Sequence, residues 1–138
     1  MKRISQAIKK AELLLPGGPF QKNGTDPSDR LMAEMNGLIE ENPREAWWFI
    51  KKWGSHSDEE IRTRVACFLL EHLLEYHFDR YFPLVRETCR KNELFASTFK
   101  MCWKFGQTNQ PENSKAFDEL LSELKLNNRK YLITYSTA

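Results

Sequence analysis

The run SDEEIRTRVACFLLEHLLEY, residues 57–76, carries the strongest helical pattern in the chain. Ser57 and Glu60 have the S-x-x-E spacing of a capping box, and the acidic residues between them favour a helix start because they lie near the positive end of the dipole. Ile61, Val65, Phe68, His72 and Tyr76 are predicted to form one buried stripe. Further apolar residues widen this surface and leave a polar strip at Glu60, Arg64, Glu71 and Glu75. A helix that is apolar on most sides is packed between neighbours, so residues 57–76 are expected at the centre of the domain.

Six further helices are predicted around this one. Their expected ranges are about 2–15, 26–42, 42–53, 79–89, 92–106 and 113–126. Asp26, Asn42, Asp79 and Asn92 are the expected cap residues, because short polar side chains accept hydrogen bonds from the free amides of a first turn. The bulky positions of the 42–53 helix are Trp47, Trp48, Ile50 and Trp53.

The end of the chain is expected to leave the helical pattern. Asn127 and Asn128 are predicted to stop the last helix, and residues 131–135 have a strand-like composition that would need a partner. We therefore divide a single all-helical domain, residues 1–138, into an N-terminal helix and loop (1–25), a helical-repeat core (26–126) and a C-terminal tail (127–138).

Composition limits the class of protein. With 21 Lys+Arg against 19 Asp+Glu, the net charge of +2 excludes a strongly basic nucleic-acid arm and an acidic disordered tail. Cys67, Cys89 and Cys102 are odd in number and have no C-x-x-C spacing, which predicts reduced thiols. The N-terminal apolar residues are spaced by helical turns rather than gathered as in a signal peptide. We expect a cytoplasmic protein with no membrane partner, because the sequence has no run of about 18 apolar residues.

A repeat emerges when the chain is shifted by 34 residues against itself. The shift pairs two bulky helices and two capped helix starts, and periods of about 20–50 residues are typical of stacked helical repeats. The pairs are Trp47/Tyr81, Trp48/Phe82, Ile50/Leu84, Asp58/Asn92, Glu59/Glu93, Ile61/Phe95 and Val65/Phe99.

At this point the chain resembles a known family. Residues 57–66, SDEEIRTRVA, look like the start of the second helix of a HEAT repeat, where an acidic turn precedes an aliphatic residue, an arginine and a small apolar residue. The resemblance covers residues 43–76 and, more weakly, residues 79–105, where Ala96 stands in the place of Arg62. It implies an all-α fold of about seven helices in a short α-solenoid, a right-handed helical stack, and a role as a binding scaffold.

Catalytic motifs do not emerge from the sequence. Residues 16–19, PGGP, lack the spacing of a phosphate-binding loop, and His56, His72 and His77 form no zinc-binding motif. Cys67 and His72 are expected on diverging faces of their helix, and Cys102 is close in sequence only to two lysines. No catalytic residue, metal or cofactor is predicted, although a small enzyme of uncharacterised type stays an alternative.

Binding residues are easier to nominate. Aromatic and basic side chains follow the 42–53 helix and end the 92–106 helix, and tryptophan is enriched in interface hot spots. The candidate partner-binding residues are Lys51, Lys52, Trp53, His56, Arg62, Trp103 and Lys104. We expect a non-enzymatic adaptor for another protein. The alternative is a nucleic-acid-associated helical-repeat protein, favoured by basic residues such as Lys9 and Lys10 near the N-terminus. The alternative interpretation of Trp53 and Trp103 is that both are core residues.

Overall fold

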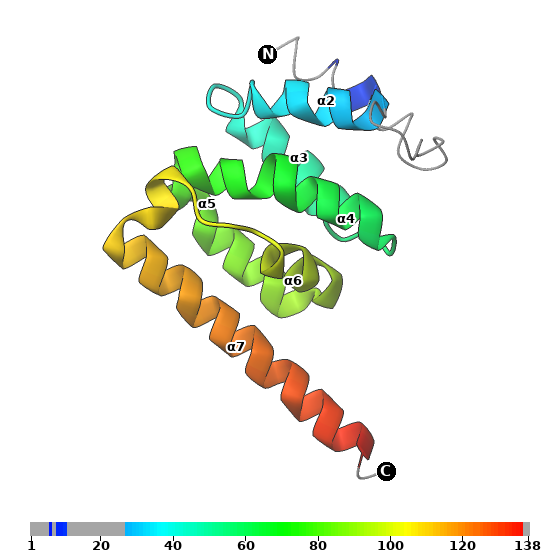
Figure 1. Cartoon of the computed structure of the whole chain (residues 1–138), viewed down its shortest axis with the longest axis vertical. Coiled ribbons are helices and arrows are strands. Elements are labelled where there is room, and N and C mark those ends of the chain that lie inside the picture. The colour runs from blue at the N-terminus through cyan, green and yellow to red at the C-terminus, as the bar shows by residue number, and fades with distance from the viewer. Residues whose placement is uncertain (1–5, 7, 11–26, 137–138) are drawn as a thin grey trace.

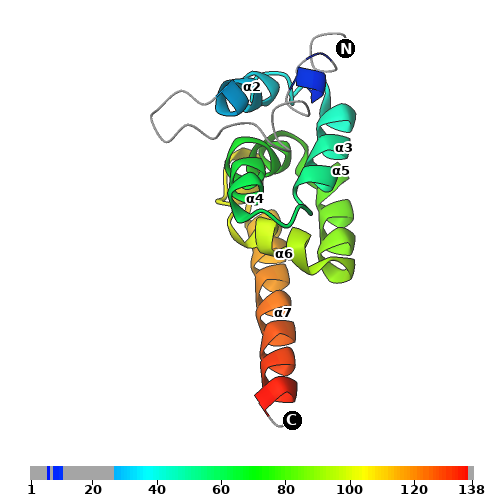
Figure 2. The same ribbon diagram turned by 90° about the vertical axis from the view of Figure 1, so that its right-hand side faces the viewer.

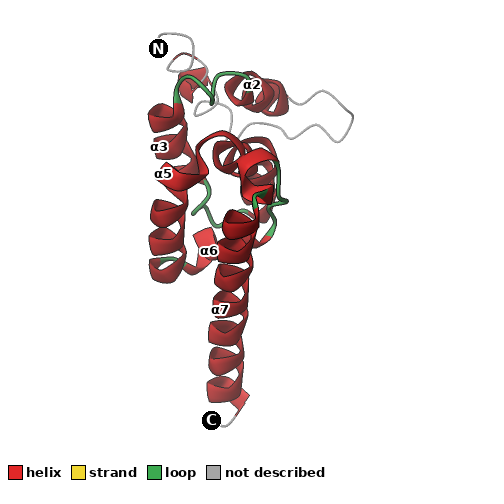
Figure 3. Ribbon diagram, turned by 90° about the vertical axis from the view of Figure 1, so that its left-hand side faces the viewer, coloured by secondary structure: helices red, strands yellow, loops and turns green. Residues whose placement is uncertain are grey.

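The computed structural model describes the backbone of residues 6, 8–10 and 27–136, and the side chains of residues 6, 8–10 and 32–126. In this part of the chain every regular element is a helix, which confirms the predicted all-α class (Figure 3). The elements are α2 (Pro27–Asn36), α3 (Pro43–Trp53), α4 (Glu59–Val65), the π-helical turn η1 (Ala66–Leu70), α5 (Glu71–Lys91), α6 (Glu93–Lys100), the 3-10 turn η2 (Gly106–Asn109) and α7 (Pro111–Ser136).

Six α-helices thus lie in the described residues, where about seven were expected for the whole chain. The expected helix at 2–15 lies outside the described residues, apart from Gln6 and Ile8–Lys10, which are helical. The predicted cap Asp26 also lies outside them. None of the helices described is long and apolar enough to cross a lipid bilayer.

The helices pack in two columns. One column contains α3 above the C-terminal part of α5, and the other contains α2 above α4 and α6 (Figure 2). The continuous segment from α4 through η1 into α5 joins the columns, because η1 contacts α2, α3 and α6. The helix predicted to be central is therefore central. α7 packs on α5 and η2, and its C-terminal part extends beyond the other helices (Figure 1).

Aromatic side chains fill the lower core and attach α7. Phe99 lies with its ring 4.7 Å from that of Phe117, and both side chains are buried. Outside the core, Arg90 forms two hydrogen bonds of 2.8 Å to the carboxylate of Glu123. Buried Leu120 and Leu124 continue the same face of α7, so the described part of this helix is held by burial along one stripe.

The π-helical turn corrects the predicted stripe of the central helix. The buried residues are Ile61, Val65, Leu69 and Leu73, whereas Phe68 and His72 are half-buried and Tyr76 is exposed. A π-helical turn accommodates one additional residue, so every later side chain moves about one position around the helix. Glu71, which was expected in the polar strip, is consequently buried with 6% exposure.

The helix ends show which expected caps form. Asn92 caps α6 by accepting from Phe95 N at 3.1 Å, as predicted. At α4 the cap is Asp58, which accepts from Glu60 N at 2.9 Å, and not Ser57. Asn42 occupies the expected cap position of α3, but its side chain donates to Leu38 O instead.

The expected break before residue 79 is a kink inside α5. His77 has non-helical angles, φ −138° and ψ 45°. The side chain of Gln107 replaces the missing backbone bonds there, because its Oε1 accepts from Phe78 N at 2.9 Å and its Nε2 donates to Tyr76 O at 2.7 Å. The predicted cap Asp79 is therefore wrong: the amide at the break is satisfied by a residue 29 positions away.

Three predicted helix ends also differ. α2 ends at Asn36 instead of residue 42, and α6 ends at Lys100 instead of residue 106. α7 continues through Asn127 and Asn128 to Ser136, so residues 131–135 are helical and not a strand. Asparagine lowers helix propensity only modestly relative to alanine, and two of them do not stop a helix that is already formed.

The 34-residue repeat matches one helix of each unit. Ile61 and Phe95 are both buried, as are Val65 and Phe99. In the preceding helices the pairs disagree, because Trp48 and Leu84 are exposed while Phe82 and Ile50 are buried. The buried residues of α3 instead match those of α5 at a shift of 32, as Ala46/Phe78, Phe49/Tyr81, Ile50/Phe82 and Trp53/Val85.

Candidate functional site

Four of the predicted binding residues meet at the connection between α3 and α4. The His56 ring stacks on Trp53 with centroids 5.6 Å apart, and Lys52 Nζ lies 5.2 Å from the Trp53 ring. Arg62 Nη1 donates to His56 O and Ser57 O, both at 2.9 Å. These contacts hold the connecting loop closed over the end of α3.

Burial shows that this cluster is mainly structural. Trp53 is 6% exposed and packs against Phe49 at 6.2 Å, so its prediction as a contact residue is wrong and the alternative core interpretation applies. Arg62 is 8% exposed and is also unsuited to partner contact. Trp53 Nε1 and Arg62 Nε are buried and have no hydrogen-bond partner among the described residues.

Trp103 and Lys104 lie on other elements. Trp103 is 74% exposed, and its backbone N donates to Glu71 Oε2 at 2.9 Å. Lys104 Nζ is 2.7 Å from both Asp118 Oδ1 and Ser114 Oγ on α7. The predicted single contact surface is therefore divided between the α3–α4 loop and the segment that leads to α7.

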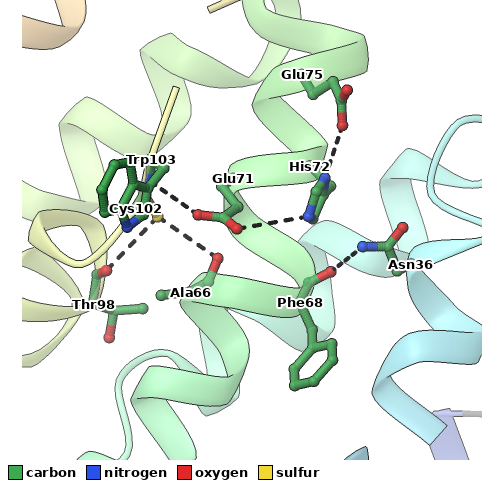
Figure 4. A network of polar contacts seen from close by, with 9 residues as sticks. All are labelled: Asn36, Ala66, Phe68, Glu71, His72, Glu75, Thr98, Cys102 and Trp103. Atoms are coloured by element: carbon green, nitrogen blue, oxygen red, sulfur yellow. Dashed lines mark hydrogen bonds and ion pairs between the residues drawn. The ribbon is translucent and has the colours of Figure 1, made fainter. Parts of the chain in front are cut away.

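A polar network surrounds the residue that follows the π-helical turn (Figure 4). Glu71 bonds to the Trp103 amide with one oxygen, and its other oxygen is 3.6 Å from His72 Nε2. His72 Nδ1 is 2.8 Å from Glu75 Oε1, and the His72 ring stacks on Phe105 at 5.3 Å. The carboxylates and the imidazole thus hold the extended segment after α6 against α5.

Alternate residues of that segment make the attachments. Trp103 binds Glu71, Phe105 stacks on His72, and Gln107 bridges the kink. Gly106 lies between them with φ +49°, where a Cβ would be 2.6 Å from Glu75 Cγ and 2.9 Å from Glu75 O. Only glycine combines this backbone angle with so close an approach to a carbonyl.

The freed carbonyls of the π-helical turn also have partners. Asn36 Nδ2 donates to Phe68 O at 2.7 Å, and Cys102 Sγ lies 3.9 Å from Ala66 O. Within the described residues no group of three or more His, Cys, Asp and Glu side chains has the geometry of a metal site. The network therefore acts as a clamp between α2, α5 and the segment after α6.

Glu71 has a pH signature. Burial raises the pKa of this carboxyl above its ordinary value of 4.5, although the hydrogen bond from Trp103 opposes the shift. The folded state then binds the proton more tightly than the unfolded state, so the contribution of Glu71 to stability falls as the pH rises through the raised pKa. Sequence reasoning missed this role because the partner amide is 32 residues away.

Glu71→Gln keeps an oxygen acceptor for the Trp103 amide but cannot ionise. We expect its free energy of unfolding, relative to the wild type, to increase as the pH rises above about 4.5. Urea unfolding of both proteins between pH 4 and pH 8 measures this difference. A constant difference over that range would show that burial does not shift the Glu71 pKa.

The three cysteines provide a second test of the packing. Burial raises the pKa of Cys89 to about 12 and that of Cys102 well above its ordinary value, and the pKa of exposed Cys67 is also raised. A disulfide-exchange reagent at pH 7.5 should therefore label Cys67 slowly in the native protein, and the other two only after unfolding. Rapid labelling of all three native thiols would contradict the packing.

An open groove lies between α3 and the end of α5. It has a volume of about 620 Å³. Trp48 forms one wall with 69% exposure, Phe49 lies at its base, and Lys51 and Lys52 are exposed beside it. The remaining lining residues are Ile8, Glu45, Ser55, Thr88 and Asn92. We call this site the Trp48 groove.

The sequence held a signal for Trp48 that the prediction did not use. Ala46, Phe49, Ile50 and Trp53 are spaced by three and four residues, which is the spacing of one buried helix face. Trp48 falls outside that set, so its prediction as a bulky core position is wrong. Lys51 and Lys52, predicted to bind a partner, do lie at this surface.

Comparison of the chain with known protein families, curated proteins and solved structures gives no match.

Proposed function

We propose that this chain is a non-enzymatic, cytoplasmic helical-repeat module that binds another protein through the Trp48 groove. The observation that carries the proposal is Trp48 itself, whose indole is 69% exposed at the edge of a concave site. Exposed tryptophan at a groove is the type of residue on which binding energy concentrates, because its rigid ring buries a large area with little loss of rotamer freedom.

The packing of the helices supports a HEAT-like stack. In stacked helical repeats, the first helices of neighbouring units pack on one another and so do the second helices. Here α3 packs on α5 and α4 packs on α6, and Asp58 and Asn92 cap α4 and α6. The shifts of 32 and 34 residues are consistent with two units whose connecting loops differ in length.

The chemistry of the described side chains supports a binding role over a catalytic one. A nucleophilic cysteine needs a lowered pKa, and burial moves the pKa of all three thiols the other way. His72 and Glu71 are used to hold the segment after α6. The three free thiols are also consistent with a reducing compartment.

Capture of partners from native lysate tests the proposal. The tagged full chain is compared with Trp48→Ala and with Trp103→Ala, which removes the other exposed tryptophan, in the presence and absence of nuclease and at two salt concentrations. We expect a protein partner that survives nuclease, binds the wild type and Trp103→Ala, and is lost with Trp48→Ala.

Both variants should fold, because neither side chain is buried. Circular dichroism and thermal unfolding provide this control. Loss of all partners on nuclease treatment would favour the nucleic-acid alternative, and capture that depends on Trp103 instead of Trp48 would move the binding surface to the segment after α6.

A further inference from the structure

The shape of the Trp48 groove suits a side chain from a partner. Phe49 at its base is 2% exposed, whereas the Trp48 indole presents most of its surface to solvent. A bulky apolar side chain placed between them would remove apolar surface from water on both sides. The groove is open and of moderate volume, so an extended or helical segment can enter it without displacing the core.

The charges at the groove are arranged for isolated acidic groups. Lys51 and Lys52 are adjacent and exposed, and both line the groove with Glu45 as the one carboxylate. Further along the rim, Glu87 has its pKa lowered by Lys91 first and also by Lys51. The positive pair is therefore bordered by Glu45 and Glu87, and a continuous polyanion would meet these carboxylates as well as the lysines.

The polar side chains of the groove are already engaged. Ser55 Oγ donates to Lys51 O at 2.8 Å, and Thr88 Oγ1 donates to Leu84 O at 2.8 Å. Asn92 Oδ1 accepts from Phe95 N as the cap of α6. The hydroxyl hydrogens and the amide oxygen are thus unavailable for reading the edge of a nucleobase, which leaves apolar contact and charge as the means of recognition.

We propose that the Trp48 groove binds an acidic peptide segment of a partner protein, with a bulky apolar side chain on Trp48 and Phe49 and carboxylates beside Lys51 and Lys52. This inference rests on the proposed function and specifies the chemistry of the partner. Two favourable ion pairs at a rim mainly determine which segment binds, while the apolar anchor supplies affinity.

Selection from a phage library of random 12-residue peptides tests the inference. The full chain is immobilised, and peptides that also bind Trp48→Ala are discarded. We expect the enriched peptides to combine Phe, Trp or Leu with neighbouring Asp or Glu. A synthetic copy of one enriched peptide is then titrated by fluorescence anisotropy against the wild-type chain.

Charge reversal provides the matched control. Lys51→Glu with Lys52→Glu should weaken the acidic peptide by about tenfold or more, and should improve binding of a copy in which the acidic residues are lysine. Lys115→Glu with Lys125→Glu makes the same change in net charge at exposed positions of α7 and should leave both affinities within about twofold.

Three results would overturn the inference. They are enrichment of neutral or basic peptides, no enrichment at all, and Trp48-dependent binding of a 20-nucleotide oligothymidylate whose affinity falls steeply with salt. If lysate capture still gives a nuclease-resistant partner that depends on Trp48, only the acidic chemistry is wrong. If Trp48-dependent capture fails as well, the proposed function falls with it.

Discussion

Trp53→Ala is expected to lower the free energy of unfolding by about 3–5 kcal/mol, the usual range for truncating a buried tryptophan. The ring is 6% exposed and contacts Phe49 and His56, so its removal leaves a cavity beneath the α3–α4 loop. Urea or thermal unfolding followed by circular dichroism measures the loss.

Trp48→Ala is the control on the same helix. It removes the same side chain from an exposed position, and we expect a change within about 0.5 kcal/mol. Similar losses for the two variants would contradict the assignment of Trp53 to the core and of Trp48 to the surface.

Arg62→Met is expected to cost about 2–4 kcal/mol of stability. The guanidinium donates to His56 O and Ser57 O, and hydrogen bonds to charged groups each contribute about 1.5–3 kcal/mol. Methionine fills part of the volume but leaves both carbonyls without this donor. Relief of the desolvation of a buried charge offsets part of the loss, which is why the expected cost is less than the sum.

Arg64→Met provides the matched comparison two residues along α4. Arg64 is half-buried, and its Nη1 hydrogen bond, 3.3 Å long, is made to Glu60 O within its own helix. We expect a smaller loss than for Arg62→Met when both are measured by urea unfolding. A larger loss for Arg64→Met would mean that Arg62 does not hold the α3–α4 loop.

Local signals in the sequence were sufficient for the helices and some caps. Asn92 caps α6 as predicted, because its partner is three residues away. Likewise, the apolar character of residues 61–74 placed their helix at the centre of the fold. Such features depend on spacing within one or two helical turns, which the sequence displays directly.

The features that sequence reasoning missed depend on distant residues. Glu71 is buried because a π-helical turn shifts it inward and the Trp103 amide satisfies it. The kink at His77 is bridged by Gln107, and no local pattern announces that contact. Trp48 differs, since its exposure could have been read from the buried face formed by Ala46, Phe49, Ile50 and Trp53.

Photo-crosslinking from position 48 tests the central claim most directly. A photoreactive amino acid replaces Trp48 in the full chain, and a second version carries it at Trp103, the other strongly exposed tryptophan. After irradiation in nuclease-treated native lysate, we predict a covalent adduct to one protein from position 48 and none from position 103. An adduct from position 103 alone, or none from either position, would contradict the assignment of the Trp48 groove as the partner-binding surface.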